Sequence, residues 1–201
     1  AINVPRFSRK EIRIERNQIN MGGKTVKMAY YKSSLDIEIP DENLIGVLTP
    51  TDIYKADDLK QLVEANLDHP VGTPAFDLLC QNKKNICVIV CDLTRPMQTD
   101  KVLPIVLKRI EKNNPGAKLN ILIAVGTHRP LSDSEIDYLC GPDSRRRYAV
   151  YNHESGSPDK LVFIKDSPKD YPLYVNKILY ESDFKIAIGA VKPHPIFGWS
   201  G

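Results

Sequence analysis

The spacing of hydrophobic residues from residue 86 onward predicts strands that alternate with helices. Two short apolar runs rich in β-branched residues, 86–90 and 119–125, are typical of strands buried on both faces. The segment 99–116 between them carries apolar residues at helical spacing and ends in Asn-Pro-Gly, a sequence that stops a helix. A strand, a helix and a second strand in this order are expected to form a parallel pair.

Later segments continue this alternation. Ser132 and Glu135 have the spacing of a capping box, and Gly141 stands where the helix that they start would end. Four further elements are predicted, namely strands over 147–152, 160–165 and 184–191 and a helix over 174–183. The predicted fold class is therefore α/β, a mostly parallel sheet with helices on both faces and Rossmann-like layering.

The chain before residue 86 has weaker patterns. Residues 35–40 alternate like an edge strand with one solvated side, and 56–70 form an amphipathic helical pattern that a proline ends. A further helix is predicted over 71–81, and the basic stretch 6–16 is interpreted as the solvated face of a strand. Because no repeat or low-complexity linker interrupts the chain, we predict a single domain over residues 1–201.

Composition and charge narrow the class of protein. Hydrophobic residues make up 42% of the chain and charged residues 26%, which is the balance of an ordinary soluble domain. A net charge of +3 is too small to indicate a nucleic-acid partner, and no apolar run is long enough to span a membrane. The four cysteines form no Cys-x-x-Cys pair and no signal peptide is visible, so we expect a reduced, cytoplasmic protein without a zinc site.

Polar residues gather directly after the predicted parallel strands. The segments that follow the strands are Cys-Asp-Leu-Thr-Arg-Pro at 91–96, Gly-Thr-His-Arg-Pro at 126–130, His-Glu at 153–154 and Lys-Pro-His-Pro at 192–195. Ligands of open α/β sheets bind at the carboxyl ends of the strands. Three of the four histidines are therefore expected at this edge, where structural histidines have no reason to collect.

Each of these residues also has a structural explanation. Asp92 can form an Asx-turn with Thr94, and Arg95 can pair with a surface carboxylate. His128 can be a donor to a loop carbonyl, and His153 is better interpreted as a turn residue.

The sequence excludes several chemistries and suggests one. It contains no Gly-x-Gly-x-x-Gly after a strand, no P-loop and no Gly-x-Ser-x-Gly elbow, so dinucleotide, P-loop and serine-hydrolase sites are not supported. The planar guanidinium of Arg95 suits a small carboxylate. Two histidines, His128 and His194, can exchange protons with such a substrate near neutral pH.

Three motifs occur in one order that is more specific than any of them alone. They are Asp-Leu-Thr-Arg-Pro at 92–96, Gly-Thr-His-Arg-Pro at 126–130 and Pro-His-Pro-Ile-Phe-Gly-Trp-Ser-Gly at 193–201. In this order they resemble the N-terminal domain of the nickel-dependent lactate racemase family. The likeness includes 69–72 and 175–183 and covers most of the chain, although the first sixty residues add little to it.

The resemblance implies a cofactor and a set of residue roles. In that family the cofactor is a nickel pincer nucleotide, pyridinium-3,5-bisthiocarboxylic acid mononucleotide nickel. The residues that the motifs match to cofactor binding are Asp92, Leu93, Thr94 and Arg95. By the same match Arg95 would also bind the substrate, and His128 and His194 would be the two acid–base residues. No residue of the chain is matched to a nickel ligand.

The implied activity is racemisation or epimerisation of a small 2-hydroxy acid. Such an acid has no carbonyl to stabilise a carbanion at C2, so hydride transfer to the cofactor would replace proton abstraction at that carbon. One histidine would take the hydroxyl proton from one enantiomer, and the other histidine would serve the opposite enantiomer. Because the family motif continues past Ser-Gly and a C-terminal domain follows it, we expect Gly201 to cut a cofactor loop in a fragment that is inactive alone.

Two other functions remain open from the sequence. The same sheet edge can hold a nucleotide or a carboxylate without turnover, as a non-catalytic binding module, and the turn arginines Arg95 and Arg129 favour this reading. The third possibility is an interaction scaffold in which all histidines are structural.

Overall fold

The computed structural model divides the chain into two compact units, residues 1–55 and residues 56–201. It describes residues 23–31, 33–48, 58–95, 97–166, 170–194, 196 and 198–200. The strand predicted over 6–16 lies outside these described residues. The single domain over 1–201 stays a prediction.

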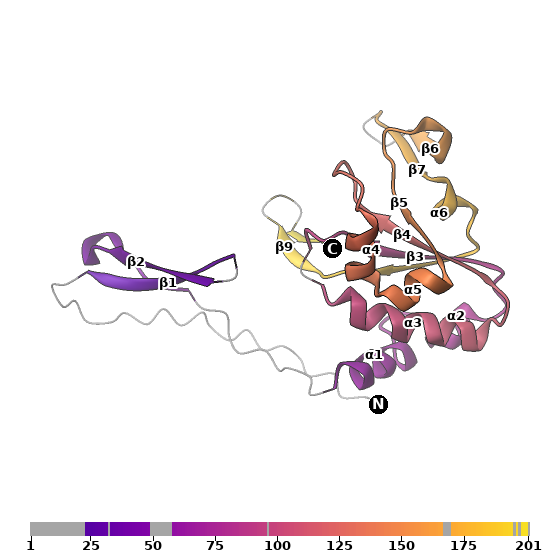
Figure 1. Ribbon diagram of the computed structural model, residues 1–201, viewed down its shortest axis with the longest axis horizontal. Helices are drawn as coiled ribbons and strands as arrows, with labels where there is room; N and C mark the ends of the chain where they lie inside the picture. Colours follow the sequence, from indigo (N-terminus) through magenta and orange to yellow (C-terminus); the bar gives the residue numbers. More distant parts are fainter. Residues whose placement is uncertain are drawn as a thin grey trace. The chain divides into compact units, whose positions relative to one another are not determined.

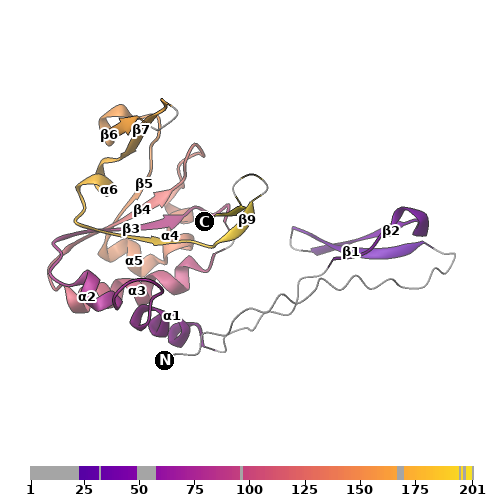
Figure 2. The ribbon, with the colours of Figure 1, turned by 180° about the vertical axis from the view of Figure 1, so that it is seen from behind.

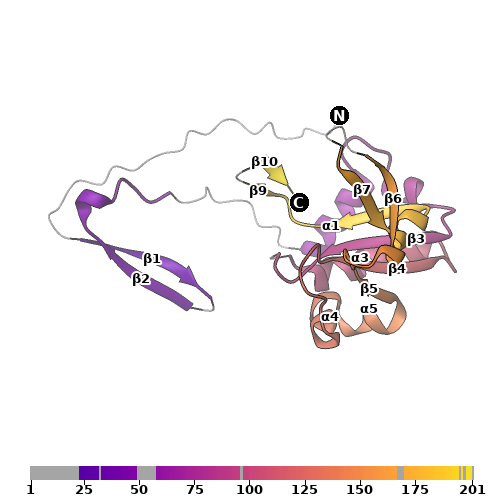
Figure 3. The same cartoon turned by 90° about the horizontal axis from the view of Figure 1, so that it is seen from above.

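The first unit contains a two-stranded antiparallel ribbon (Figure 3). Its elements are β1 (Lys24–Tyr30), β2 (Ser33–Ile39) and a short 3-10 helix, η1 (Asp41–Asn43). Side chains alternate between the faces of the ribbon, so that Met28 lies opposite Leu35 on an apolar face and Lys27 lies opposite Asp36 on a polar face. The strand predicted over 35–40 is confirmed, and it has the solvated side that its alternation indicated.

The second unit is built on a parallel sheet of four strands. In spatial order these are β5 (Ala149–Asn152), β4 (Lys118–Ala124), β3 (Asn85–Cys91) and β8 (Phe184–Ile188). All three strand pairings are parallel, so the carboxyl ends of the strands meet at one edge of the sheet. The chain runs from β3 through β4 to β5 and then returns to β8 on the other side of β3. Strand order therefore reverses between β3 and β8, which is where open α/β sheets bind ligands.

Helices lie on both faces of the sheet, as predicted, but they cover the two faces unequally (Figures 1 and 2). One face carries α1 (Leu59–Asp68), α2 (Phe76–Cys80), α3 (Thr99–Asn113), α4 (Asp133–Cys140) and α5 (Pro142–Arg147). The other face carries the five-residue α6 (Lys177–Glu181).

The main core lies between the sheet and the larger helical layer. Val88 and Val90 of β3 and Ile121 of β4 pack there with Leu103 and Ile110 of α3, and all five are fully buried. Their alternation along each strand and their helical spacing along α3 are the patterns that predicted these elements. In the described part of the chain, no helix is both long and apolar enough to cross a membrane.

The helix predicted over 174–183 is wrong in its first three residues, which belong to a strand. The strand is β7 (Pro172–Asn176), paired antiparallel with β6 (Leu161–Asp166). Tyr174 lies opposite Phe163, and the two rings meet edge to face with their centroids 5.5 Å apart. The helix begins only after Asn176, whose side chain accepts a hydrogen bond from the Ile178 N–H at 2.9 Å.

After β8 the chain forms a small antiparallel hairpin (Figure 3). Its strands are β9 (Lys192–His194) and β10 (Gly198–Ser200). Earlier in the chain, a 3-10 turn, η2 (Pro158–Lys160), precedes β6. The other predicted helices are present, although only Phe76–Cys80 of the segment predicted over 71–81 is helical. The helix α4 has the capping box of Ser132 and Glu135 that its sequence indicated. The hairpin thus continues the chain from the carboxyl end of β8.

Candidate functional site

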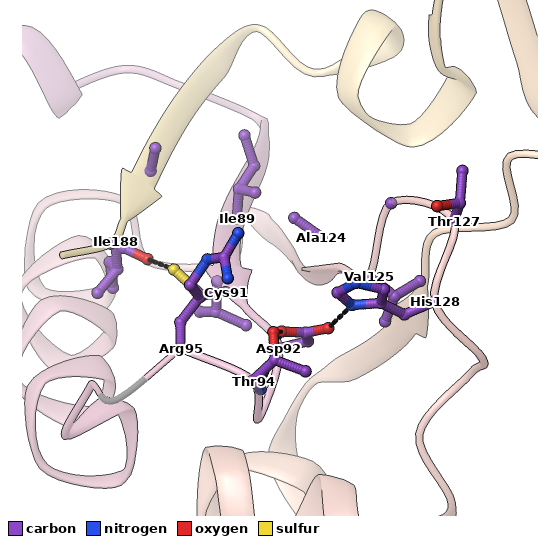
Figure 4. Close-up of a pocket in the computed structure, with 14 residues that line it drawn as sticks. Ile89, Cys91, Asp92, Thr94, Arg95, Ala124, Val125, Thr127, His128 and Ile188 are labelled. Carbon is purple, nitrogen blue, oxygen red and sulfur yellow. Dashed lines mark hydrogen bonds and ion pairs between the residues drawn. The ribbon is translucent and has the colours of Figure 1, made fainter. Parts of the chain in front are cut away.

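A cavity of about 410 Å³ opens at the carboxyl edge of the sheet, where strand order reverses (Figure 4). It is bounded by the ends of β3, β4 and β8 and by the turns that follow β3 and β4. The polar side chains that line it are Asp92, Thr94, Arg95, Thr127 and His128. The sequence motifs at 92–96 and 126–130 therefore meet around one cavity, although they are separated by the whole of α3 and β4.

Small residues make the space for this cavity. Ala124 ends β4 and Ala187 is the last residue but one of β8, each with a single methyl group, and Gly189 follows β8. A Cβ atom at Gly189 would come within 3.3 Å of the Cys91 Sγ, so the Cys91 side chain would have to shift slightly to accept one. Glycine suits this close approach.

The buried carboxylate of Asp92 binds the imidazole of His128 inside the cavity. Asp92 Oδ2 and His128 Nδ1 lie 2.6 Å apart, as the dashed line in Figure 4 shows. The Asp92 residue is only 4% exposed, whereas the His128 side chain is 52% exposed. The carboxylate therefore supports the ring from within the protein, and the rest of the ring remains open to a ligand.

The second oxygen of Asp92 is held by Thr94. Asp92 Oδ1 accepts from the Thr94 backbone N–H at 3.0 Å and from the Thr94 hydroxyl at 2.5 Å. This is the Asx-turn that the sequence allowed as a structural explanation of the motif. The turn and the contact with His128 coexist, because each uses a different carboxylate oxygen.

Asp92 is ionised under ordinary conditions. Burial would raise the pKa of its carboxyl group, but the hydrogen bonds from His128 and Thr94 outweigh burial and hold the pKa below its usual value. An ionised carboxylate only accepts hydrogen bonds, so the proton between the two side chains belongs to His128 Nδ1. The neutral ring then has its lone pair on Nε2, the nitrogen that a general base requires.

The two arginines of the motifs have different surroundings. Arg95 lines the cavity, and no carboxylate of the described residues lies within ion-pair distance of its guanidinium. Arg129 is bound by both carboxylate oxygens of Glu135, at 2.6 and 2.8 Å, and donates to the Pro130 carbonyl. Only Arg95 of this pair is placed to receive an anion in the cavity.

Two predicted site residues do not line this cavity. Leu93 lies in the turn after β3 and is 37% exposed. His194 is half-buried on β9, where its Nδ1 accepts a hydrogen bond from the Ile196 N–H at 3.1 Å. His153 follows β5 at the same edge of the sheet and contacts Asn176 through its Nδ1 at 3.2 Å, in keeping with a turn residue.

Sequence reasoning missed the cavity residues without ionisable groups. Thr127 lies inside a motif that was singled out for its histidine and arginine. Ala187 and Gly189 lie at the carboxyl end of β8. The available signal was the change from β-branched to small residues at the strand ends. Among the described residues, no group of three histidines, cysteines or acidic residues is placed to hold a metal ion.

The fold and the cavity define an α/β protein with a ligand site at the switch point of its parallel sheet and a carboxylate-supported histidine in that site. Residues 30–201 match the family model of the lactate racemase N-terminal domain. The chain belongs to this family, which confirms the resemblance of the three motifs.

Two characterised relatives are lactate racemases. The chain is 33% identical over 178 residues to the lactate racemase of Thermoanaerobacterium thermosaccharolyticum and 31% identical over 178 residues to that of Lactiplantibacillus plantarum. In both comparisons the match covers 88% of this chain and 42% of the relative. The chain thus spans less than half the length of these relatives.

Solved structures agree with the fold. The lactate racemase apoprotein of T. thermosaccharolyticum superposes with a TM-score of 0.77 and 31% identity, over 89% of this chain and 42% of that chain. A protein from Thermotoga maritima superposes with a TM-score of 0.57 and 24% identity, over 71% of this chain and 36% of that chain. The second likeness supports the fold only.

Proposed function

We propose that this chain is the cofactor- and substrate-binding part of a racemase or epimerase that acts on a small 2-hydroxy acid. The observation that carries the proposal is the pair of Asp92 and His128, joined at 2.6 Å inside a cavity that Arg95 also lines. An oriented base beside an unoccupied guanidinium suits a substrate that carries both a hydroxyl and a carboxylate. The lactate racemase relatives support the same class of reaction.

The residues at the cavity fit the nucleotide part of a nickel pincer cofactor. The small residues Ala124, Ala187 and Gly189 leave space for a flat ring at the strand ends. Thr127 and Arg95 offer the hydroxyl and guanidinium donors that bind phosphate and ribose oxygens. We propose no nickel ligand within the described residues, so the remaining part of the full-length protein would complete the metal site.

The residues of this chain would bind the substrate and move its hydroxyl proton. Arg95 would hold the substrate carboxylate by two parallel hydrogen bonds, which fixes the C2 hydroxyl relative to His128. His128 Nε2 would accept the hydroxyl proton, and Asp92 would stabilise the imidazolium that forms. When bound, the cofactor would supply an acceptor that takes the hydride from C2 and returns it to either face.

His194 would serve the opposite enantiomer from the other side of the substrate. Its Nδ1 accepts from the Ile196 N–H, so in the neutral ring the proton lies on Nε2. To return a proton to the keto oxygen as the hydride comes back to C2, His194 would act as an imidazolium, in which Nδ1 no longer accepts from Ile196. The neutral ring that remains would accept the hydroxyl proton of the opposite enantiomer.

Racemisation by the full-length protein is the direct test. The full-length protein loaded with the nickel pincer nucleotide should racemise at least one member of a panel of 2-hydroxy acids, followed by optical rotation. His128→Ala and His194→Ala should each lower kcat by about 10²-fold or more, the usual contribution of a general acid–base group.

Full activity in both histidine variants would overturn the assignment of the acid–base residues. Saturable binding of a 2-hydroxy acid or a mononucleotide without turnover, in protein shown to hold the cofactor, would instead support a binding module.

A further inference from the structure

We propose that Thr94 and Asp92 are positioning residues that set the tautomer of His128, rather than residues that clamp the cofactor. The inference rests on the proposed function, because it concerns the base of the proposed reaction. It revises the roles that family resemblance gave to these two residues.

Thr94 fixes the orientation of the Asp92 carboxylate. A carboxylate on a short side chain can rotate about the bond to Cβ, so one hydrogen bond does not fix its plane. Thr94 supplies two donors to the same oxygen, the backbone N–H at 3.0 Å and the hydroxyl at 2.5 Å. Because Oδ1 is pinned in this way, Oδ2 is directed at His128 Nδ1, 2.6 Å away.

The ionised carboxylate of Asp92 in turn sets the tautomer of His128. Thr94 donates to Asp92 in both contacts, and these hydrogen bonds, like that of His128, lower the pKa of the carboxyl group. A carboxylate held ionised accepts only, so Nδ1 must carry the proton and Nε2 must carry the lone pair. In this way Thr94 helps Asp92 to hold the ring proton of His128 on Nδ1.

The Asp92 carboxylate has little hydrogen-bonding capacity left for a cofactor. Both of its oxygens have partners in the described structure, and the residue is 4% exposed. A ligand in the cavity would meet the exposed ring of His128 and the side chain of Arg95 before it met this carboxylate. Removal of the Asp92 charge should therefore act on His128 first.

The variant Asp92→Asn gives the sharpest test. The two donors of Thr94 would select the amide oxygen for the Oδ1 position, which leaves the amide NH₂ facing His128 Nδ1. An NH₂ group only donates, so Nδ1 would become an acceptor and the ring proton would move to Nε2. Nitrogen-15 NMR of the full-length apoprotein should show His128 as the Nδ1–H tautomer in the wild type and as the Nε2–H tautomer in Asp92→Asn.

The activity of the loaded enzyme should follow the tautomer. Asp92→Asn should lower kcat by about 10³-fold or more, the order of loss seen when a catalytic histidine is held in the wrong tautomer. KM should change little, because Asp92 does not face the substrate. A retained Nδ1–H tautomer in Asp92→Asn would overturn the inference.

Thr94 itself is tested by a hydroxyl deletion with a conservative partner. Thr94→Val keeps the shape and the backbone N–H but removes the hydroxyl, whereas Thr94→Ser keeps it. Thr94→Val should lower kcat by about tenfold, the value of one hydrogen bond to a charged group, and should speed exchange of the His128 Nδ1 proton. Thr94→Ser should restore both readouts.

Matched deletions elsewhere separate positioning from general loss of structure. Thr127→Val removes another hydroxyl from the cavity lining, and it should leave the Nδ1–H signal of His128 unchanged. Thr73→Val removes a hydroxyl that bonds the Pro74 carbonyl in an exposed loop, and it should change neither readout. Equal effects of Thr94→Val and Thr94→Ser would contradict a role of the hydroxyl.

The two readouts fail independently. Inactive wild-type enzyme with the expected tautomer switch would reject the proposed reaction and keep the Thr94–Asp92–His128 arrangement. Active wild-type enzyme in which Asp92→Asn leaves the His128 tautomer unchanged would reject the arrangement and keep the reaction.

Discussion

The turns that follow β3 and β4 share an Arg-Pro ending, but their arginines serve different purposes. After β3, Arg95 lines the cavity, with no carboxylate of the described residues in ion-pair contact. After β4, Arg129 is held by both oxygens of Glu135. The same dipeptide thus places a guanidinium at the cavity in one turn and forms a structural brace in the other.

The difference comes from the helix after each turn. The helix that follows the second turn, α4, starts with a capping box, and its Glu135 already faces backward to the cap residue Ser132. That geometry places a carboxylate beside Arg129. The first turn leads into α3, whose cap residue is Gln98, and the residue three positions further on is Lys101 rather than a glutamate. No equivalent carboxylate is therefore positioned beside Arg95.

The largest expected effect of this difference is on activity. Arg95→Ala should lower kcat/KM of the loaded full-length enzyme by about 10²- to 10³-fold, because it removes a charge-assisted, two-pronged contact with the substrate carboxylate. Arg95→Lys keeps the charge but loses the two parallel hydrogen bonds of the guanidinium, so its kcat/KM should lie between those of the wild type and Arg95→Ala. Steady-state kinetics with a 2-hydroxy acid measure both variants.

The corresponding change at the other turn is the control. Arg129→Ala should leave kcat/KM of the folded enzyme near that of the wild type. Loss of activity in Arg129→Ala equal to that in Arg95→Ala would show that the two turns do not differ in the way proposed.

Most of the fold followed from hydrophobic spacing. The buried runs of β3 and β4 and the amphipathic face of α3 are long, periodic signals, and each element appeared where it was predicted. The helix prediction for 174–183 was wrong at its start because the first residues pair with β6 in a strand. No local pattern in the sequence indicates that pairing. A sequence read locally contains no information about that partner.

The site was predictable at the level of motifs but not of contacts. The rule that ligands bind beyond the carboxyl ends of parallel strands brought the segments after β3 and β4 together correctly. It did not reveal that Asp92 supports His128, because that contact spans 36 positions and depends on strand register. It also left Arg95 and Arg129 equivalent, since their difference lies in one hydrogen-bonded glutamate.

A second difference between the turns is their backbone. Gly126 has a φ of +61°, a conformation that L residues adopt at a cost, whereas none of the residues from Asp92 to Arg95 has a positive φ. Gly126→Ala should therefore destabilise the protein by about 1 kcal/mol, even though a Cβ there would meet no atom within 4 Å. Thermal unfolding of the apoprotein should record a midpoint lower by roughly 2 to 4 °C.

Two substitutions check that this cost comes from the backbone. Gly126→Asn should lose less stability than Gly126→Ala, since asparagine tolerates positive φ better. Gly156→Ala, at a glycine without positive φ and with equally open space, should be close to neutral. A neutral Gly126→Ala would show that the second turn does not need glycine.

The smallest expected effect concerns the charge of Glu135. Its hydrogen bonds from Arg129 and from Ser132 lower the pKa of the carboxyl group from its ordinary value of 4.5 to about 2. Because the folded pKa lies below the unfolded value, the stabilisation by this carboxylate is fully present above about pH 4.5 and is lost as pH falls toward about 2. Arg129 is exposed to solvent and Glu135 is partly exposed, so the effect on stability should be small at any pH.

Carboxyl carbon-13 NMR of Glu135 measures this pairing directly. In Arg129→Ala the pKa of Glu135 should rise but stay below its ordinary value, because the Ser132 N–H and hydroxyl still donate to Oε2. Arg95→Ala should leave the pKa of Glu135 unchanged, since Arg95 belongs to the other turn. If removal of Arg129 left the titration of Glu135 where it was, the brace would be absent in solution and both arginines would be available to anions.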